Sequence, residues 1–523
     1  MFFHHIHLFQ KDGSYLEADK KPITNVQLCF YEWSGVLIIV KERGKFLTRS
    51  LDGHPKSREM PIQSQFSLPA LQHPPTLDSS FQPAAVWNRS YAQLVLGTES
   101  PVSIHFALEQ GEGSVLRHTS AVLPEGHPQA FLNFRYTERL LKFLLWSKGG
   151  TRVHFDGPVG LGVALKKHFS DTPTGRFDAD FMSRVHETPF EVILTPDLPS
   201  EQSSAQKLGR NLDGCRIGFD LGGSDRKVAA VVDGKVIFSD ETTWDPYHKE
   251  DPQYHRDGIM DSLSKASNHL PRVDAIGGSS AGVYVNNQPR VASLFRGVPD
   301  PLFDSKVKPL FRDLAHEWAV PLEVINDGDV TALAGSMTLG ENAVLGLAMG
   351  TSEATGYVNA DGNVTTWLNE LAFAPVDYAE TAPADEWSGD RGCGVQYFSQ
   401  QAVDRLLDPA GIELPSDLPL PEKLVEVQNL MKMDDPRARK IYETIGSYLG
   451  YGVAHYADYY NLRHLLILGR VTSGEGGEII LSKARKTLVS EFPEVAKKIA
   501  FHVPGEKDKR HGQAIAAASL PSL

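Results

Sequence analysis

Two glycine-rich turns in this chain have the residue types that bind phosphate. The first follows a strand-like apolar run at residues 217–221 and consists of Gly222, Gly223 and Ser224. Backbone N–H groups in such a turn can converge on phosphate oxygens, because glycine has no side chain to block the approach. Asp220, just before the turn, is a candidate ligand of Mg²⁺ through water, since this ion keeps much of its hydration.

The same order of elements returns later in the chain. An apolar run at 344–349 leads into Gly350, Thr351 and Ser352, and a second strand-like run follows at 354–358. Ser224 and Thr351 add hydroxyl donors to the two turns. One such hairpin alone is most simply an ordinary tight turn. The matched pair predicts two related halves that bind a polyphosphate from both sides.

A candidate catalytic carboxylate lies between these turns in the sequence. Asn326 and Asp327 follow the strand-like run 322–325 and precede a helical stretch. Phosphoryl transfer needs positioning, charge stabilisation and one base for the attacking hydroxyl, a role that Asp327 can fill. The alternative is N-capping of the helix, which Asn and Asp favour. If Asp329 provides the cap instead, Asp327 stays free for catalysis.

The elements that must position these residues alternate between strands and helices. Strands are expected at 227–232, 273–276 and 465–468, and helices from about 252, at 305–318, at 437–460 and at 512–520. This alternation predicts an α/β fold after residue 211. Residues 1–205 are expected to form a strand-rich α+β accessory domain, joined by an aperiodic Pro/Ser/Gln linker at 196–210.

Composition excludes several classes of protein. A chain of 523 residues is expected to form two or three domains, and its formal charge of −13 argues against a nucleic-acid surface. The three cysteines lie far apart and give no disulfide framework. No apolar run approaches the roughly 20 residues of a membrane span. We therefore expect a cytoplasmic protein without membrane or nucleic-acid partners.

Five motifs together resemble, in order, those of the ROK family of sugar kinases and sugar-responsive repressors. Residues 218–224 and 349–351 resemble the two phosphate motifs, and 324–327 resembles the segment that carries the catalytic base. Residues 278–283 resemble the substrate loop, with Ser280 and Gly282. The adenosine motif is matched by Gly469, Gly474 and Gly476.

The resemblance implies a duplicated ribonuclease-H-like fold of two lobes, as in actin and hexokinase. The lobes would cover 211–340, completed by the C-terminal helix, and 341–523. It further implies that Mg-ATP and a sugar bind in the cleft, that Asp327 is the base, and that Asn326 and Glu370 contact the sugar. A homodimer is expected.

The chain departs from the family at the zinc and sugar motifs. Of four zinc ligands only Cys393 remains, because Phe373, Glu386 and Ser388 occupy the other positions. A structural zinc needs four good ligands, so none is expected. Phe373 and Val395 also replace two sugar contacts, which predicts a more apolar pocket and weak or no turnover of free glucose.

Two functions are therefore compatible with the sequence. The first is an ATP-dependent kinase of a sugar or sugar-like alcohol, which the retained Asp220, Asp327 and both phosphate turns favour. The alternative is a catalytically weak or inactive regulatory protein that senses sugar or nucleotide, which the altered substrate motif favours.

Overall fold

A computed structural model describes residues 38–42, 45–49, 66–202, 208–503 and 506–523. The chain divides into two compact units, Met1–Ser67 and Leu68–Leu523. In the first unit the described residues form one antiparallel pair, β1 (Ile38–Glu42) and β2 (Lys45–Arg49). Residues 203–207 of the predicted linker lie outside the described residues.

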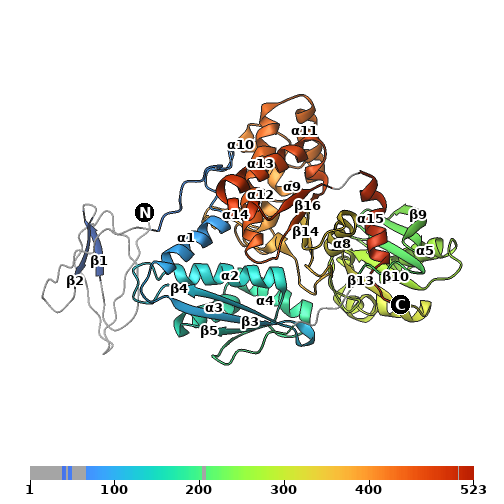
Figure 1. The fold of residues 1–523 in the computed structure, drawn as a ribbon, viewed down its shortest axis with the longest axis horizontal. Helices are drawn as coiled ribbons and strands as arrows, with labels where there is room; N and C mark the ends of the chain where they lie inside the picture. Colours follow the sequence, from blue (N-terminus) through green and yellow to red (C-terminus); the bar gives the residue numbers. More distant parts are fainter. Residues whose placement is uncertain (1–37, 43–44, 50–65, 203–207, 504–505) are drawn as a thin grey trace. The chain divides into compact units, whose positions relative to one another are not determined.

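The second unit begins with an accessory region, residues 68–202. Its sheet has the order β4-β3-β5-β6, formed by β3 (Val102–Glu109), β4 (Val115–Val122), β5 (Arg152–Asp156) and β6 (Glu191–Leu194). Four helices accompany these strands (Figure 1): α1 (Ala84–Leu96), α2 (Leu132–Lys148), α3 (Val159–Asp171) and α4 (Pro173–His186).

Helix outweighs strand in this described region, so the strand-rich expectation is wrong here. The helix starts follow ordinary rules. Thr172 caps α4, because its hydroxyl accepts a hydrogen bond from the Gly175 N–H at 3.0 Å, and Pro173 occupies the first turn. Helix α2 is buried over most of its length, which means that it packs against neighbours on several sides.

The first lobe contains a five-stranded sheet with the order β13-β10-β7-β8-β9. An antiparallel meander of β7, β8 and β9 continues into the parallel strands β10 and β13. The bounds are β7 (Cys215–Leu221), β8 (Asp225–Val232), β9 (Lys235–Thr243), β10 (Ala275–Ser280) and β13 (Leu322–Asn326). A small hairpin, β11 (Val283–Val285) and β12 (Gln288–Val291), follows β10.

The two faces of this sheet are covered by different helices. Val228 and Ala230 pack with α5 (Pro252–Ser267) and α7 (Leu310–Trp318), whereas Ala229 and Val231 pack with α15 (Glu506–Ala518). This alternation follows the two-residue period of a strand. A Cβ on Gly218 would lie 1.9 Å from the Ala514 carbonyl oxygen. Glycine in β7 thus allows the Ala-rich C-terminal helix to approach closely (Figure 1).

The second lobe repeats this plan with the order β15-β14-β16-β17. The antiparallel hairpin is β14 (Val344–Met349) and β15 (Glu353–Val358), and the parallel strands are β16 (His464–Leu468) and β17 (Ala500–His502). The predicted α/β class of residues 211–523 is confirmed, because each sheet joins an antiparallel hairpin to parallel strands.

Helices surround the second sheet and connect it to the first lobe. They are α8 (Asp327–Leu339), α9 (Gln400–Arg405), α10 (Leu407–Ala410), α11 (Leu420–Lys432), α12 (Pro436–Ala457), α13 (Glu475–Glu491) and α14 (Pro493–Ala496), with the short turn η4 (Leu371–Phe373). Helix α6 (Asp300–Leu302) belongs to the first lobe. Within the described ranges, no helix combines the length and the apolar character that crossing a membrane requires.

Candidate active site

The two predicted phosphate turns are built alike. Each has three residues between its strands, 222–224 and 350–352. The Gly222 N–H donates to the Asp225 carbonyl at 2.9 Å, and the Gly350 N–H donates to the Ser352 carbonyl at 3.0 Å. Ser224 and Thr351 are exposed at the turns. Their hydroxyls are therefore accessible to a ligand.

The space around the two turns differs. A Cβ on Gly223 would lie 2.0 Å from the Tyr247 hydroxyl oxygen, whereas a Cβ on Gly350 would meet only the Ser352 carbonyl at 3.4 Å. The Arg296 guanidinium lies 4.1 Å from the centre of the Tyr247 ring. The Tyr247 side chain thus leaves room only for glycine at position 223, whereas the space beside Gly350 in the second turn holds no protein atom closer than the Ser352 carbonyl.

The predicted adenosine motif adjoins the second phosphate turn. Gly469 has φ of 102°, and a Cβ there would lie 2.4 Å from the Met349 carbonyl oxygen. Gly474, with φ of 69°, precedes α13 and has open space beside it. Gly476 instead is buried against the Tyr442 ring, so its small size serves helix packing. Gly469 and Gly474 are the better placed of the three to face a ligand.

Asp327 begins α8, where the first lobe meets the second. Gly328 lies so close to β15 that a Cβ there would be 2.3 Å from the Thr355 carbonyl oxygen. The Asp327 side chain accepts a hydrogen bond from the Gly328 N–H at 3.0 Å and is partly accessible. The predicted base therefore lies at the junction of the two lobes.

The helix cap is provided by Asn326 and not by Asp329, which decides between the two alternatives that the sequence left open. The Asn326 Oδ1 accepts from the Gly328 N–H at 2.7 Å, and its Nδ2 donates to the Gly282 carbonyl at 2.9 Å. Asp329 is buried and accepts from the Tyr357 N–H at 3.2 Å and the Asn369 amide at 3.0 Å. Asn326 thus holds the predicted substrate loop against α8.

Asp220 lies close enough to Asp327 to influence its ionisation. Burial, followed by the negative charge of Asp220, raises the pKa of Asp327 to about 6. Asp220 itself is buried, and its Oδ1 accepts from the Ser279 hydroxyl at 2.6 Å. The Lys227 ammonium lies 3.9 Å from the other Asp220 oxygen. The structure therefore brings together the two carboxylates that the sequence assigned to metal and base.

Ser280, a predicted substrate residue, has a different environment. It is fully buried, and its hydroxyl shares a 2.6 Å hydrogen bond with the Tyr284 hydroxyl. Its contact positions the aromatic ring at the start of the β11–β12 hairpin.

Glu370 is placed by the accessory region. The Glu370 N–H donates to the Trp146 carbonyl at 3.0 Å, and the Asn369 N–H donates to the Ser147 carbonyl at 3.1 Å. Both acceptors lie in the last turn of α2, where carbonyl groups have no partner within the helix, so Asn369 and Glu370 satisfy them. Burial and the charge of Asp327 raise the pKa of Glu370 to about 7. Glu370 is thus an electrostatic neighbour of the predicted base.

Two further carboxyl groups lie near this site: Asp329, which the sequence suggested only as a helix cap, and Glu353, which was missed from sequence. Asp329 and Glu353 are buried, and burial is the main cause that raises the pKa of each to about 8. Glu353 is 3% exposed; its Oε1 lies 3.4 Å from the Tyr456 hydroxyl, and its Oε2 has no hydrogen-bond partner among the described residues. The sequence signal that could have indicated Glu353 is an acidic residue directly after a glycine turn, at the start of an otherwise apolar strand.

The donor set fits magnesium held through water. Among the described residues no group of three or more His, Cys, Asp or Glu side chains is arranged to hold a metal ion directly. The Asp220 Oδ2, which lies 3.9 Å from the Lys227 ammonium and near Asp327, suits an ion that retains several waters and binds substrate phosphates. The expected absence of structural zinc stays a prediction, which metal analysis of the purified protein would check.

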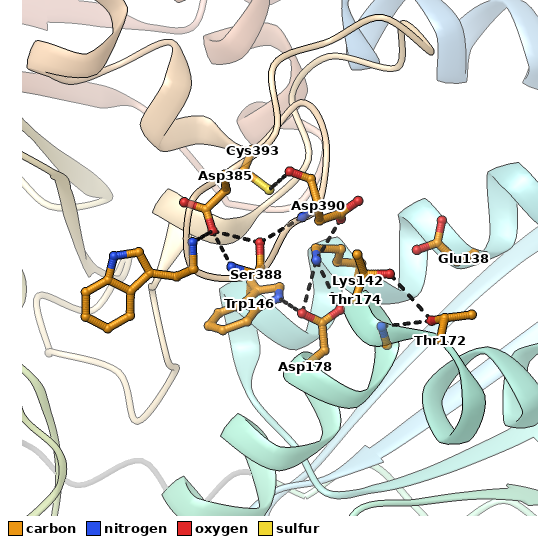
Figure 2. A network of polar contacts seen from close by, with 12 residues as sticks. Glu138, Lys142, Trp146, Thr172, Thr174, Asp178, Asp385, Ser388, Asp390 and Cys393 are labelled. Atoms are coloured by element: carbon orange, nitrogen blue, oxygen red, sulfur yellow. Dashed lines mark hydrogen bonds and ion pairs between the residues drawn. The ribbon is translucent and has the colours of Figure 1, made fainter. Parts of the chain in front are cut away.

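The segment that corresponds to the zinc motif packs against the accessory region. Figure 2 shows Lys142 between Asp178 and Asp390, with its ammonium 3.0 Å and 2.7 Å from their carboxylate oxygens. In the same segment the Cys393 thiol lies 3.8 Å from the Asp390 carbonyl oxygen. Ion pairs and hydrogen bonds therefore fix this loop onto α2 and α4.

Phe373 packs against aromatic rings of the accessory region. Its ring lies 4.4 Å from that of Trp146 and 5.5 Å from that of Phe177, measured between centroids. Val395 is buried. Val395 thus packs in the interior, whereas Phe373 is half-buried and joins the accessory region to the second lobe. The more apolar sugar pocket stays a prediction.

Neither a protein-family model nor a curated protein sequence matches the chain. The structure matches solved structures of ROK-family sugar kinases and regulators over about 58% of the chain, and the remaining N-terminal part is unmatched. A ROK hexokinase from Thermus thermophilus is 19% identical, with a TM-score of 0.45, over 58% of this chain and 97% of that one.

Two more ROK structures match similarly. A glucokinase from Streptomyces griseus, in complex with glucose and AMPPNP, is 20% identical with a TM-score of 0.44, over 59% of this chain and 99% of its own. A transcriptional regulator, a homologue of the E. coli MLC protein, is 16% identical with a TM-score of 0.48, over 59% and 79%. Because one fold hosts different functions, the residues of the site must carry any functional assignment.

Proposed function

We propose that the protein is an ATP-dependent kinase that phosphorylates a hydroxyl group of a sugar or sugar-like compound. The observation that carries the proposal is the pair of like-built glycine turns, together with Asp327 at the lobe junction near Asp220. Two such turns suit the phosphates of one nucleotide, and the carboxylate suits a general base.

Each residue then has a role in transfer. Gly222, Gly223, Ser224, Gly350 and Thr351 bind the phosphates. Gly469 and Gly474 lie near the adenosine, and Gly476 supports them by packing α13 against Tyr442. Asp327 accepts the proton of the attacking hydroxyl, and its pKa of about 6 leaves it mostly ionised at neutral pH. Asp220 holds Mg²⁺ through water, and the bound ion neutralises charge on the phosphates.

The acceptor sugar is held by residues around Asp327. Glu370 and the remaining amide hydrogen of Asn326 orient its hydroxyl groups, with the Gly282 backbone nearby. Ser280 contributes indirectly through Tyr284, because its own hydroxyl is buried. Such positioning supplies much of the rate enhancement in phosphoryl transfer.

A second candidate function is a catalytically weak or inactive regulatory protein that senses sugar or nucleotide. It is favoured by contacts of the accessory region with both lobes. Glu187, just after α4, pairs with Arg290 and with Lys308, the latter at 3.0 Å, while α2 bonds to Asn369 and Glu370. Lobe closure completes the site in many kinases, and a bridge between lobes opposes it.

One experiment separates the two candidates. The full-length protein is given Mg-ATP with a panel of sugars and polyols, and ADP release is measured for it and for Asp327→Asn. Acceptor-dependent ADP release that the variant lacks supports the kinase. Sugar binding by calorimetry without ADP release from any acceptor contradicts the kinase and supports the sensor. The expected homodimer stays a prediction for light scattering.

A further inference from the structure

A pocket of about 130 Å³ lies beside Asn326 and is lined by three parts of the unit Leu68–Leu523. The β11–β12 hairpin and the end of β13 form one wall, and residues 364–368 of the second lobe form another. The accessory region completes it with Gln110, Gly111, Val185 and His186. The region that the sequence left without a role thus contributes to a pocket that shares Asn326 with the proposed substrate site.

His186 provides this pocket with a neutral hydrogen-bond donor. Its Nε2 accepts a hydrogen bond from the Gly150 N–H at 3.1 Å, which places the ring proton on Nδ1. Burial, followed by the charge of Arg290, lowers the pKa of His186 to about 4, so the ring is uncharged at neutral pH. The Nδ1 atom lies beside Gly111, another pocket residue. A Cβ built on Gly111 would be 3.6 Å from this nitrogen.

The remaining lining mixes polar and apolar groups without a positive charge. The Thr365 hydroxyl is buried and has no hydrogen-bond partner among the described residues, so a ligand hydroxyl can satisfy it. Val185 and Leu368 supply apolar surface, whereas the Trp367 ring is already stacked on Tyr357 and has the Lys148 ammonium 3.2 Å from its centre. The acidic lining residues are Glu323 and Asp329, and no Lys or Arg lines the pocket. An anionic ligand is therefore disfavoured.

We propose that this pocket binds the second ring of a neutral saccharide, so that the substrate is a disaccharide or a glycoside with a ring-sized neutral group. The proposal rests on the kinase function above and names its substrate class. Hydroxyl groups of the ring would bond to His186 Nδ1 and Thr365 Oγ1, and its apolar face would pack on Leu368. A cavity of roughly 150 Å³ accepts one six-membered ring, so the pocket of about 130 Å³ limits the ligand at this position to no more than one ring.

The test measures both binding and transfer with the full-length protein. Calorimetry without nucleotide compares cellobiose, maltose and lactose with glucose and galactose, and ADP release with Mg-ATP is measured for the same sugars. We expect at least one disaccharide to bind at least ten times more tightly than its component hexoses. Equal or weaker binding of every disaccharide, with phosphorylation of a monosaccharide, overturns the pocket proposal and leaves the kinase proposal standing.

Two variants assign the effect to this pocket. Thr366 is exposed and lines the pocket, so Thr366→Trp should fill it and abolish the preference for the two-ring sugar. Thr381 is also exposed but does not line the pocket, and Thr381→Trp serves as the matched control that retains the preference. An unchanged preference in Thr366→Trp contradicts the proposal.

His186→Phe separates a binding role from a structural one. Loss of the Nδ1 donor should lower the ratio of kcat/KM for the disaccharide to that for its hexose by about tenfold, the equivalent of one hydrogen bond of about 1.4 kcal/mol. A fold-wide defect would lower both values together and leave the ratio unchanged, which would count against the assignment. Tight disaccharide binding without any phosphorylation would instead support the pocket and overturn the kinase proposal.

Discussion

Two buried clusters of carboxyl groups, in different parts of the unit Leu68–Leu523, show opposite electrostatic designs. In the first, Asp178 and Asp390 surround the Lys142 ammonium (Figure 2). Arg139 also pairs with Asp390, at 2.9 Å. In the second, Asp327, Asp329, Glu353 and Glu370 have no basic side chain among the causes that shift their pKa values.

The ionisation of the two clusters differs at Asp390 but not at Asp178, because burial raises the pKa of Asp178 to about 6 despite the charge of Lys142. Burial alone would raise the pKa of Asp390, but the charges of Arg139 and Lys142 lower it below its usual range. In the second cluster burial raises every pKa, to about 6 for Asp327 and about 8 for Glu353. Compensated charges hold surfaces together, whereas uncompensated carboxyl groups in a cleft are typical of functional sites.

The largest expected effect comes from the uncompensated cluster. Asp327→Asn should lower kcat by about 10²- to 10⁴-fold, because the base is lost, while ATP affinity is retained. Kinetics with the best acceptor and calorimetry with Mg-ATP measure the two quantities. Parental turnover in the variant would mean that Asp327 has only a structural role at the start of α8.

The compensated cluster should respond through stability instead. Lys142→Met leaves Asp178 and Asp390 without their shared cation and should cost about 3–5 kcal/mol of unfolding free energy. Lys166, exposed on α3, provides the matched control, and Lys166→Met should change stability by less than about 0.5 kcal/mol. Denaturant titration measures both, and equal small losses would show that the buried ion pairs contribute little.

The pH dependence of the rate sharpens the distinction. A carboxyl group with a raised pKa loses its base function as the pH falls through that pKa, so kcat should decline below about pH 6, by about tenfold per unit in the acidic limb. Circular dichroism over the same range serves as the control for folding. A flat profile between pH 5 and pH 8 would exclude Asp327 as the titrating base.

The smallest effect concerns Glu353. Its raised folded-state pKa means that the folded chain retains a proton that the unfolded chain loses, so its contribution to stability falls as the pH rises from about 4.5 to about 8. Glu353→Gln removes this dependence, and its melting temperature should decrease less than the parent's between pH 6 and pH 8. An identical decrease in both proteins would show that Glu353 is ionised throughout.

Local sequence signals were sufficient for the framework of the site. The α/β pattern, the two glycine turns and the strand–Asn–Asp–helix junction depend on neighbouring residues, because turn geometry and strand periodicity are short-range properties. Even so, the choice between Asn326 and Asp329 as helix cap could not be made from sequence, since both residue types are favoured there and tertiary contacts engage Asp329 with Tyr357 and Asn369.

What surrounds that framework was decided by tertiary structure alone. Lys142, Asp178 and Asp390 meet from segments far apart in the chain, and nothing local in any of them indicates an ion pair. Phe373 was expected in a sugar pocket, and only the packing of α2 against the second lobe brings its ring into contact with Trp146. The sequence by itself determined which residues could perform chemistry, because backbone turns and residue types are local. The partners, the charge balance and the wall contributed by His186 arise only when distant segments pack.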